Sequence, residues 1–351
     1  MIMELASIID QYADRFMEKH GQKALPGHLK ALRAIRRCRT PASGEFYVQC
    51  PGCQHGQWKP MSCGPRSCPK CQNHEASQWI DRQQDKLLPV LYFMATFTLP
   101  YELRPLVWRH QRKVYAIFFS CVAGTLKDFG LNPKHLGAKI GMTMVLHTHS
   151  RGLDYHPHIH VVVPGGGVDL RRRQWKKKKG KYLFKESNLA TVFRARFLAA
   201  LRKAGFALPK NLPTEWVVNC EKVGKGLPAV KYLSRYLYRG VISEKNIVAN
   251  ENGRITFRYT ESKTGRTRYR TLAGEDFLQL ILQHVLPKGF RRVRDYGFLH
   301  GNAKKTLQLV QLILHVRLGI LRQRPRPAIK CPRCHIPMVI KGFRYAAWTP
   351  G

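Results

Sequence analysis

The sequence predicts an α+β protein built around an antiparallel sheet, and three patterns indicate this class. Strand-like runs rich in β-branched and aromatic residues alternate with helical periodicities along the 351 residues. The runs at 141–148 and from Ile159 are separated by a short polar connection, as in two adjacent antiparallel strands. Residues 254–261 and 266–272 flank a turn that ends at Gly265 and predict a second hairpin.

The other elements are expected in a simple order along the chain. Helices cover residues 1 to about 40, a cysteine-rich lobe extends to about residue 75, and a linking helix ends at Leu88. A strand over 92–100 and a long amphipathic helix over 103–128 lead into the paired strands. A basic loop then precedes the remaining elements, which are a helix at 188–204, a strand at 215–223 and helices at 228–239, 274–285 and 303–321.

The charge of the chain indicates a polyanionic partner. Lysine and arginine number 61 against 21 aspartate and glutamate residues, which gives a net charge of +40. Nucleic acid is the simplest partner for such a surplus. The basic run from Arg171 to Lys181 contains Trp175, so a loop that orders on its ligand could hold phosphates and stack one base. The residues predicted to bind DNA are Arg171, Arg172, Arg173, Trp175, Lys176, Lys177, Lys178, Lys179, Lys231, Arg235 and Arg239.

Membrane insertion and export are not expected. The apolar run at 309–321 is interrupted by polar residues and is shorter than the roughly 20 residues of a span. The N-terminal residues show helical periodicity with acidic side chains and no basic segment, unlike a signal peptide. We therefore expect the protein in the bacterial cytoplasm, associated with the nucleoid, where cysteines stay reduced.

The cysteine spacing predicts structural zinc. Cys50-x2-Cys53 and Cys68-x2-Cys71 form two knuckles whose four thiolates are expected to close one tetrahedral zinc site. The nearby Cys38, Cys63, His55 and His74 are either alternative ligands, a second site or buried small residues. The pair Cys331-x2-Cys334 is half a knuckle, which needs partners from elsewhere in the chain or from another subunit.

Five of the 15 histidines lie between His147 and His160 and predict a catalytic metal site. His158 and His160 point to one face of their strand, and His147 on the neighbouring strand can reach the same space. Three imidazoles with open positions suit one divalent ion, and imidazoles gathered without a metal would repel one another when protonated. His149 and His156 are candidates to support these ligands or to contact DNA.

A tyrosine pair supplies candidate nucleophiles. Tyr232 and Tyr236 are four residues apart on a predicted helix, so their phenols share one face. A phenol is a poor nucleophile at neutral pH, and a cation that polarises the attacked phosphorus makes it competent. Lys231, Arg235 and Arg239 are expected to hold the phosphate backbone or to favour the phenolate.

Several motifs together resemble the two-tyrosine HUH-endonuclease transposases of rolling-circle insertion sequences, which are related to Helitrons. These motifs are LHTHSRGL, PHIHVVVPGGG, YLSRYLYRG, HVLPKGFRRVRDYG and CPKCQ, and the likeness extends from about Cys38 to about Asn302. The resemblance implies a ferredoxin-like or RRM-like antiparallel sheet with packed helices, an N-terminal zinc-ribbon-like lobe and a helical C-terminal tail. It also implies that His158 and His160 are the HUH pair and that Tyr232 and Tyr236 are the nucleophiles. His147 is added by analogy with the spacing of three-histidine relaxase sites, and Ser67 departs from the histidine that relatives carry before CPKC.

The expected domains are a helical, zinc-binding domain at 1–88, a nuclease and transposase domain at 89–300 and a helical tail with a CxxC pair at 301–351. We expect Mg or Mn at the histidines, zinc at the N-terminal cysteines, and single-stranded DNA at transposon ends and target as the partner. Attack by a tyrosine would give a 5′-phosphotyrosine link and a free 3′-OH that can later reverse the step. The alternatives are an HUH replication initiator or relaxase, and a non-catalytic zinc- and DNA-binding protein derived from a transposase.

Overall fold

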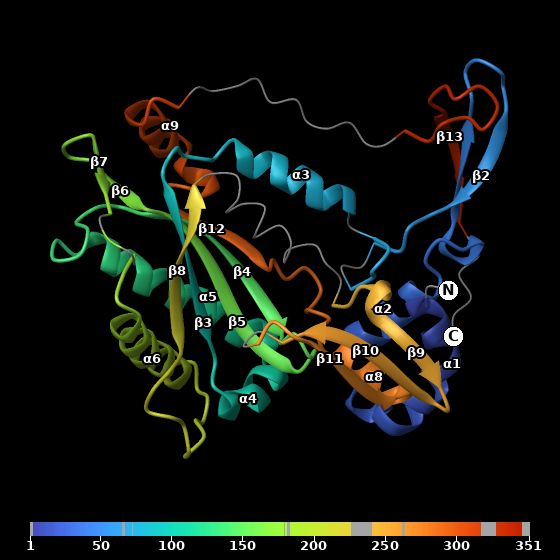
Figure 1. The fold of residues 1–351 in the computed structure, drawn as a ribbon, viewed down its shortest axis with the longest axis horizontal. Helices are drawn as coiled ribbons and strands as arrows, with labels where there is room; N and C mark the ends of the chain where they lie inside the picture. The colour runs from blue at the N-terminus through green and yellow to red at the C-terminus, as the bar shows by residue number, and fades with distance from the viewer. Residues whose placement is uncertain are drawn as a thin grey trace.

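The computed structural model describes residues 3–64, 67–71, 73–178, 180, 183–225, 241–261, 264–316 and 328–345. These residues form antiparallel sheets and helices, so the expected mixed α+β class is confirmed (Figure 1). The central sheet has five strands in the order β12-β4-β5-β3-β8, and every neighbouring pair is antiparallel. Its strands are β3 (Leu91–Thr98), β4 (Gly141–His149), β5 (Tyr155–Pro164), β8 (Val218–Lys225) and β12 (Val293–Gly297).

Two long helices, α5 (Gln111–Leu131) and α6 (Glu186–Lys203), cover one face of the central sheet. Phe118 of α5 and Phe193 of α6 are fully buried and stack on each other beneath the strands. The single helix expected at 103–128 is instead two, α4 (Arg104–Arg109) and α5, because His110 between them has φ −125° and ψ 36°. Within the described part of the chain, α5 alone is long and apolar enough to cross a membrane, and most of it is buried in this core.

The opposite face of the sheet is shared between a helix and the histidines. Trp79 and Ile80 of α3 (Asn73–Gln84) pack on side chains of the strands, among them Met94, Val145 and Val162. In Figure 1, α3 lies across this face of the sheet. The predicted linking helix therefore has a structural role, since it covers half of a face whose other half carries the candidate site.

A second body combines the N-terminal helices with residues 247–282. Helices α1 (Leu5–His20) and α2 (Pro26–Arg36) pack with α8 (Gly274–Leu282) over the sheet β11-β10-β9, made of β9 (Ile247–Glu251), β10 (Arg254–Thr260) and β11 (Thr267–Ala273). The Tyr12 hydroxyl donates to Asn250 Oδ1 at 2.7 Å across this junction. This core crosses the boundary expected near residue 88, and the domain division remains a prediction.

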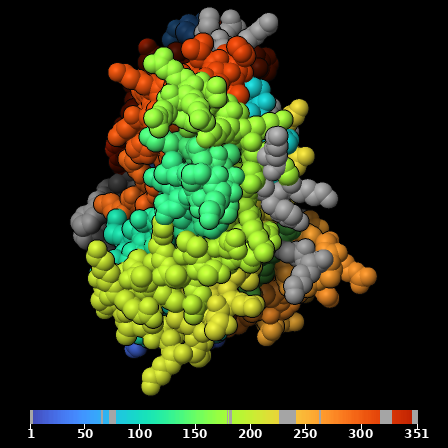
Figure 2. Space-filling view, turned by 90° about the vertical axis from the view of Figure 1, so that its left-hand side faces the viewer, coloured from blue at the N-terminus to red at the C-terminus, as the bar shows by residue number. Residues whose placement is uncertain are grey.

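The basic run forms a hairpin where a loop was expected. β6 (Gly166–Asp169) pairs with β7 (Gln174–Lys177), and Asp169 Oδ1 accepts from the backbone N–H groups of Arg171 and Arg172 in the turn. Trp175 packs against Phe298, and α9 (Lys304–Ile313) lies beside this cluster. Trp175 is partly buried in this cluster, and its role in stacking a base remains a prediction. Figure 2 shows this hairpin in light green above α6 and the chain that follows it.

The C-terminal segment is not wholly helical, contrary to expectation. After α9, the described residues 328–345 contain β13 (Val339–Arg344), which pairs with β1 (Glu45–Gln49). β2 (Gly56–Pro60) pairs with the other side of β1 and completes a small sheet. Figure 1 shows β13 in the same small sheet as β2, far from α9. Short 3-10 turns complete the described fold at Gly21–Lys23, Pro41–Ser43, Tyr101–Leu103, Glu244–Asn246 and Gly301–Ala303.

Candidate metal centre

Strand register brings three histidines to one face of the central sheet. His147 of β4 lies directly opposite His158 of β5, and Val145 lies opposite His160. Opposite residues of an antiparallel pair share a face, as do residues two apart on one strand. The sequence therefore folds into a site at the centre of the sheet, away from its exposed edges.

The three imidazoles converge closely enough for one ion. A ring nitrogen of each lies within 4.8 Å of the others, and the ring centroids are 4.7 Å apart for His147 and His160 and 4.8 Å for His158 and His160. The three predicted ligands are thus brought together. The arrangement suits a cation that takes nitrogen ligands and keeps positions open for a substrate oxygen.

The surroundings keep these histidines neutral. Burial lowers the pKa of His147 and of His158 well below the usual range, with the neighbouring imidazoles adding to the effect. Burial also lowers the pKa of His160 to about 4. A metal binds the neutral imidazole, so at neutral pH this site needs no deprotonation before a cation enters.

Hydrogen bonds orient two of the rings. His158 Nδ1 lies 2.7 Å from the His156 carbonyl, which can only accept, so Nδ1 carries the proton and Nε2 is left to bind. His160 Nδ1 lies 2.9 Å from the Thr96 hydroxyl, which can accept in the same way. Such partners are typical of metal-binding histidines, because they fix ring orientation and raise ligand basicity.

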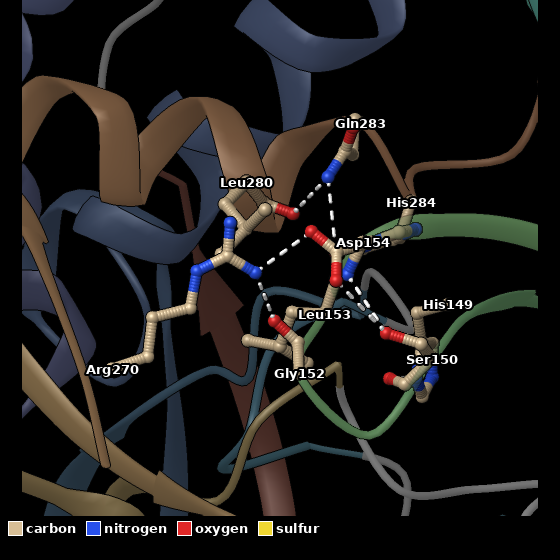
Figure 3. A network of polar contacts seen from close by, with 9 residues as sticks. All are labelled: His149, Ser150, Gly152, Leu153, Asp154, Arg270, Leu280, Gln283 and His284. Atoms are coloured by element: carbon tan, nitrogen blue, oxygen red, sulfur yellow. Dashed lines mark hydrogen bonds and ion pairs between the residues drawn. The ribbon is translucent and has the colours of Figure 1, made fainter.

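The turn between the two histidine strands is held by the second body (Figure 3). Arg270 of β11 donates from Nη1 to the Gly152 carbonyl at 2.7 Å and to Asp154 Oδ1 at 2.8 Å. Leu153, at the tip with φ 70°, is buried in the core of α1, α2 and α8. Because β4 and β5 emerge from this turn, the clamp helps set the distance between His147 and the other two ligands.

His284 connects the same turn to β4. Its Nε2 lies 2.8 Å from the Leu153 carbonyl, and its Nδ1 lies 3.1 Å from the Thr148 hydroxyl. The carbonyl can only accept, so Nε2 carries the proton and Nδ1 accepts from the threonine. Burial lowers the pKa of His284 to about 3, which is consistent with a neutral ring that satisfies both partners.

A basic pocket of about 420 Å³ adjoins His147. Its lining includes His149 and His284, and its described lining residues contain no aspartate or glutamate. Four cationic side chains line it, namely Lys30, Lys288, Arg291 and Arg292. A pocket of this charge beside a metal-binding triad suits a phosphate group or another anion.

The two supporting histidines have separate partners. His149 Nδ1 lies 3.1 Å from the Ser150 carbonyl, and its ring is 6.2 Å from that of His147. Arg104 Nη2 donates to His156 Nδ1 at 2.7 Å, and burial followed by the Arg104 charge lowers the His156 pKa. Neither belongs to the convergent triad, as the sequence interpretation held.

Several predicted residues lie outside what the structure describes. These are Tyr232 and Tyr236, with Lys231, Arg235, Arg239 and Lys179. Of the described basic run, Lys176 Nζ contacts Asp169 at 3.1 Å and the Gly137 carbonyl at 2.9 Å, so it is partly engaged within the protein. Arg171, Arg172, Arg173 and Lys177 are on the surface and remain predicted DNA contacts.

The cysteines form two four-sulfur clusters, and neither is the expected one. The predicted ligand set of Cys50, Cys53, Cys68 and Cys71 is divided between them, so that prediction is corrected. The first cluster holds Cys38, Cys63, Cys68 and Cys71, and the second holds Cys50, Cys53, Cys331 and Cys334. The first knuckle ends β1 and pairs with the C-terminal cysteines, because β13 adds to β1.

The first cluster fits a structural zinc ion. Its sulfur pairs are 3.5 Å apart for Cys38 and Cys71, 3.6 Å for Cys63 and Cys71 and 3.7 Å for Cys68 and Cys38. A tetrahedron with zinc–sulfur bonds of about 2.3 Å has edges of about 3.8 Å. Cys38, Cys68 and Cys71 also belong to the core of α1 and α2, so zinc here would stabilise that body.

Sequence reasoning missed three groups of functional residues. Thr96 carries no signal in the sequence, and His284 is only the first residue of the HVLPKGFRRVRDYG motif, so the fold alone shows that they contact His160 and Thr148. Arg291 and Arg292 lie in the same motif, but the sequence did not show that they line the basic pocket.

Comparisons with known proteins place the chain among transposases. A family described as "Putative transposase" matches residues 141–306, and one described as "Transposase zinc-binding domain" matches residues 8–99. "Putative transposase y4qJ" of Sinorhizobium fredii is 33% identical over 95% of this chain and 93% of its own length. "Transposase for insertion sequence element IS801" of Pseudomonas savastanoi pv. phaseolicola is 27% identical over 77% of this chain and 70% of its own length. No solved structure matches the chain significantly.

Proposed function

The chain belongs to the family of insertion-sequence transposases that carry an N-terminal zinc-binding domain, and we propose that it cleaves and rejoins single-stranded DNA through a 5′-phosphotyrosine intermediate. The convergence of His147, His158 and His160 beside a basic pocket carries this proposal. Rolling-circle transposition is the process that this chemistry would serve.

The topology of the central sheet supports an HUH nuclease fold. Along the chain, β3, α5, β4, β5, α6 and β8 follow one another as strand, helix, strand, strand, helix, strand. Their order in the sheet, β4-β5-β3-β8, is that of a ferredoxin-like unit, with β12 added at the edge. β5, which carries His158 and His160, is one of the two central strands of this unit, and β4 with His147 lies beside it.

The donor set is suited to a divalent ion such as Mn or Mg. Three neutral imidazoles favour Mn over Mg, because Mg prefers oxygen ligands. A cation bound there would polarise the scissile phosphate and offset the charge that develops on it. His158 and His160 are held for this purpose by the His156 carbonyl and the Thr96 hydroxyl.

Tyr236 or Tyr232 is the proposed nucleophile. The phenol oxygen bonds to phosphorus and releases its proton, while the bond to the 3′ oxygen breaks and that oxygen takes up a proton. Val241 lines the pocket beside His147, and Tyr236 lies five residues earlier. Its Cα is therefore within about 18 Å of the Val241 Cα in any conformation. The chain length thus permits the phenol to reach the triad.

The basic pocket would hold the DNA backbone next to the scissile phosphate. Lys288, Arg291 and Arg292 lie on one segment between α8 and β12, and Lys30 faces them from α2. Cationic side chains from separate segments of the protein would thus bind the same DNA strand. If one DNA phosphate binds in this pocket, the next phosphate along the strand would lie near His147, because His147 also lines the pocket.

The decisive test is a covalent adduct. Protein incubated with Mn²⁺ and a 3′-labelled single strand carrying the element's end should give a labelled band that survives denaturation. Tyr232→Phe and Tyr236→Phe together should abolish it, because phenylalanine keeps the ring and lacks the attacking oxygen. Tyr101→Phe is the matched control, since Tyr101 is 71% exposed and outside the site. An adduct that persists in the double variant would refute these nucleophiles, and cleavage without any adduct would indicate attack by water.

A further inference from the structure

Two cysteine knuckles from distant parts of the chain meet in the second cluster. Cys50 and Cys53 follow β1, whereas Cys331 and Cys334 precede β13. Sulfur distances are 3.3 Å for Cys50 and Cys334, 3.5 Å for Cys53 and Cys331 and 3.7 Å for Cys53 and Cys334. The zinc-binding family match at residues 8–99 contains the first pair only.

The two knuckles have the same backbone construction. In the first, Cys50 N–H donates to the His55 carbonyl at 2.9 Å, and Gln54 N–H donates to the Cys50 carbonyl at 3.1 Å. In the second, Cys331 N–H donates to the Ile336 carbonyl at 2.9 Å, and His335 N–H donates to the Cys331 carbonyl at 3.0 Å.

The conformation after each second cysteine also agrees. Gln54 has φ 60° and His335 has φ 58°, so both occupy the left-handed region that non-glycine residues rarely adopt. Because two segments far apart in the sequence adopt the same uncommon turn, we infer that the turn has the same structural role in both. In each knuckle the turn brings both sulfurs to one side, where the other knuckle presents its own pair.

The sulfur distances suit a metal better than disulfides. A disulfide requires about 2.05 Å between sulfurs, which is far shorter than every distance found here. The edge of a zinc–thiolate tetrahedron is about 3.8 Å, given bonds of about 2.3 Å. Four thiols, two of them on the buried Cys50 and Cys331, therefore stand where one ion would hold them as thiolates.

The surrounding sheet is too small to hold itself together by apolar burial. Its buried cluster consists of Val48, Cys50, Cys331 and Met338, so two of the four members are the ligands themselves. Glu45 and Arg344 join β1 to β13 at 2.5 Å, but Glu45 is buried, and the cost of removing its carboxylate from water offsets much of the attraction. Small sheets of this kind usually depend on a metal or a disulfide.

We propose that this cluster is a second structural zinc site and that its ion clasps residues 328–345 onto the N-terminal zinc-binding domain. Each cysteine would bind as a thiolate and release its proton to solvent, with no change of oxidation state. All four ligands come from one chain, so a second subunit is not needed to complete the site. The clasp would enclose residues 54–330, and such a closure restricts the unfolded chain as a cross-link does.

Zinc counting in full-length protein tests the clasp without reference to DNA cleavage. Cys331→Ser with Cys334→Ser should lower the zinc content by one ion per chain, and Cys50→Ser with Cys53→Ser should remove the same single ion. Combining all four changes should remove no more. The matched control is Cys121→Ala with Cys220→Ala, which removes two cysteines that belong to neither cluster. Its zinc content should stay unchanged.

Hydrogen exchange then shows whether the metal holds the C-terminal segment. In the Cys331 and Cys334 variant, the amides of β13 should exchange as in an unstructured peptide, while those of β4 and β5 keep their protection. Unchanged zinc content in this variant would overturn the proposal. So would a wild-type mass 4 Da below the reduced value under non-reducing denaturation, since it would show two disulfides in place of the ion.

Discussion

His284 should make the protein less stable in acid, and a single substitution can separate its contribution from that of other titrating groups. Its neutral ring donates from Nε2 to the Leu153 carbonyl and accepts at Nδ1 from the Thr148 hydroxyl. A second proton would occupy Nδ1 and remove that acceptor inside the core, where the residue is only 7% exposed. Burial accordingly lowers the pKa from 6.5 to about 3.

The size of the stability loss follows from the difference between the His284 pKa in the unfolded and in the folded protein. Between pH 6.5 and about 3 the unfolded chain binds the proton and the folded chain does not, so stability falls as the pH falls through this window. Each pH unit contributes about 1.4 kcal/mol, which gives about 2 kcal/mol between pH 6.5 and pH 5. His284→Gln removes this titration while an amide N–H can still donate toward Leu153. It should be about 1 kcal/mol less stable at pH 7, because Thr148 loses its acceptor.

Urea unfolding at pH 7 and pH 5 measures the effect. The wild-type protein should lose about 2 kcal/mol more than His284→Gln between these two conditions. The cysteine clusters also respond to acid, but both proteins contain them, so their contribution cancels in the comparison. His135→Gln, at an exposed histidine, serves as control and should follow the wild type. Equal losses in the wild type and His284→Gln would refute the reasoning.

Three further predictions concern the metal, the glycines and the basic hairpin. His158→Ala should abolish Mn²⁺-dependent cleavage of single-stranded oligonucleotides and leave their binding intact, and full cleavage by this variant would exclude the triad as the site of the ion. Gly297→Ala should destabilise the protein by more than the roughly 1–2 kcal/mol expected for Gly289→Ala. Both glycines have positive φ, but only at Gly297 would an added Cβ lie 1.8 Å from the Ile140 carbonyl oxygen. Equal unfolding midpoints of the two variants would contradict this. Neutral replacement of residues 176–179 should lower the log-log salt slope of single-strand binding by roughly 0.7 per lost phosphate contact, and an unchanged slope would show that the hairpin does not touch DNA.

Local patterns in the sequence predicted much of the central sheet and its site. β3, β4, α6, β8 and the β10–β11 hairpin lie close to their expected positions, because alternation and periodicity reflect which side of an element is buried. The three histidines were predicted from strand period and spacing, with His147 supported by analogy with relaxase sites, and the structure brings them together. The resemblance to insertion-sequence transposases is confirmed by the relatives. β5 begins at Tyr155, whereas the sequence predicted a strand from Ile159. The histidines before Ile159 are polar, so this part of the strand lacks the apolar pattern used to predict strands.

Tertiary structure alone decided how distant segments are combined. The cysteine knuckles were visible in the sequence, yet local spacing suggested that Cys50 and Cys53 would join Cys68 and Cys71. The pairing of β1 with β13 overrides that proximity, because a strand edge selects its partner by hydrogen bonding and packing.

The same distinction explains the supports of the metal centre. A histidine triad requires only two neighbouring strands, and strand register is a local property that the pattern of residues encodes. Thr96 lies opposite His160 on β3, so a third strand of the same sheet supplies this contact. Arg270 lies on another sheet and His284 after α8, so their contacts arise only when the two bodies pack together. The sequence by itself determined which chemistry the chain carries. The packing of the second body and of β3 against the two histidine strands decided how that chemistry is held in place.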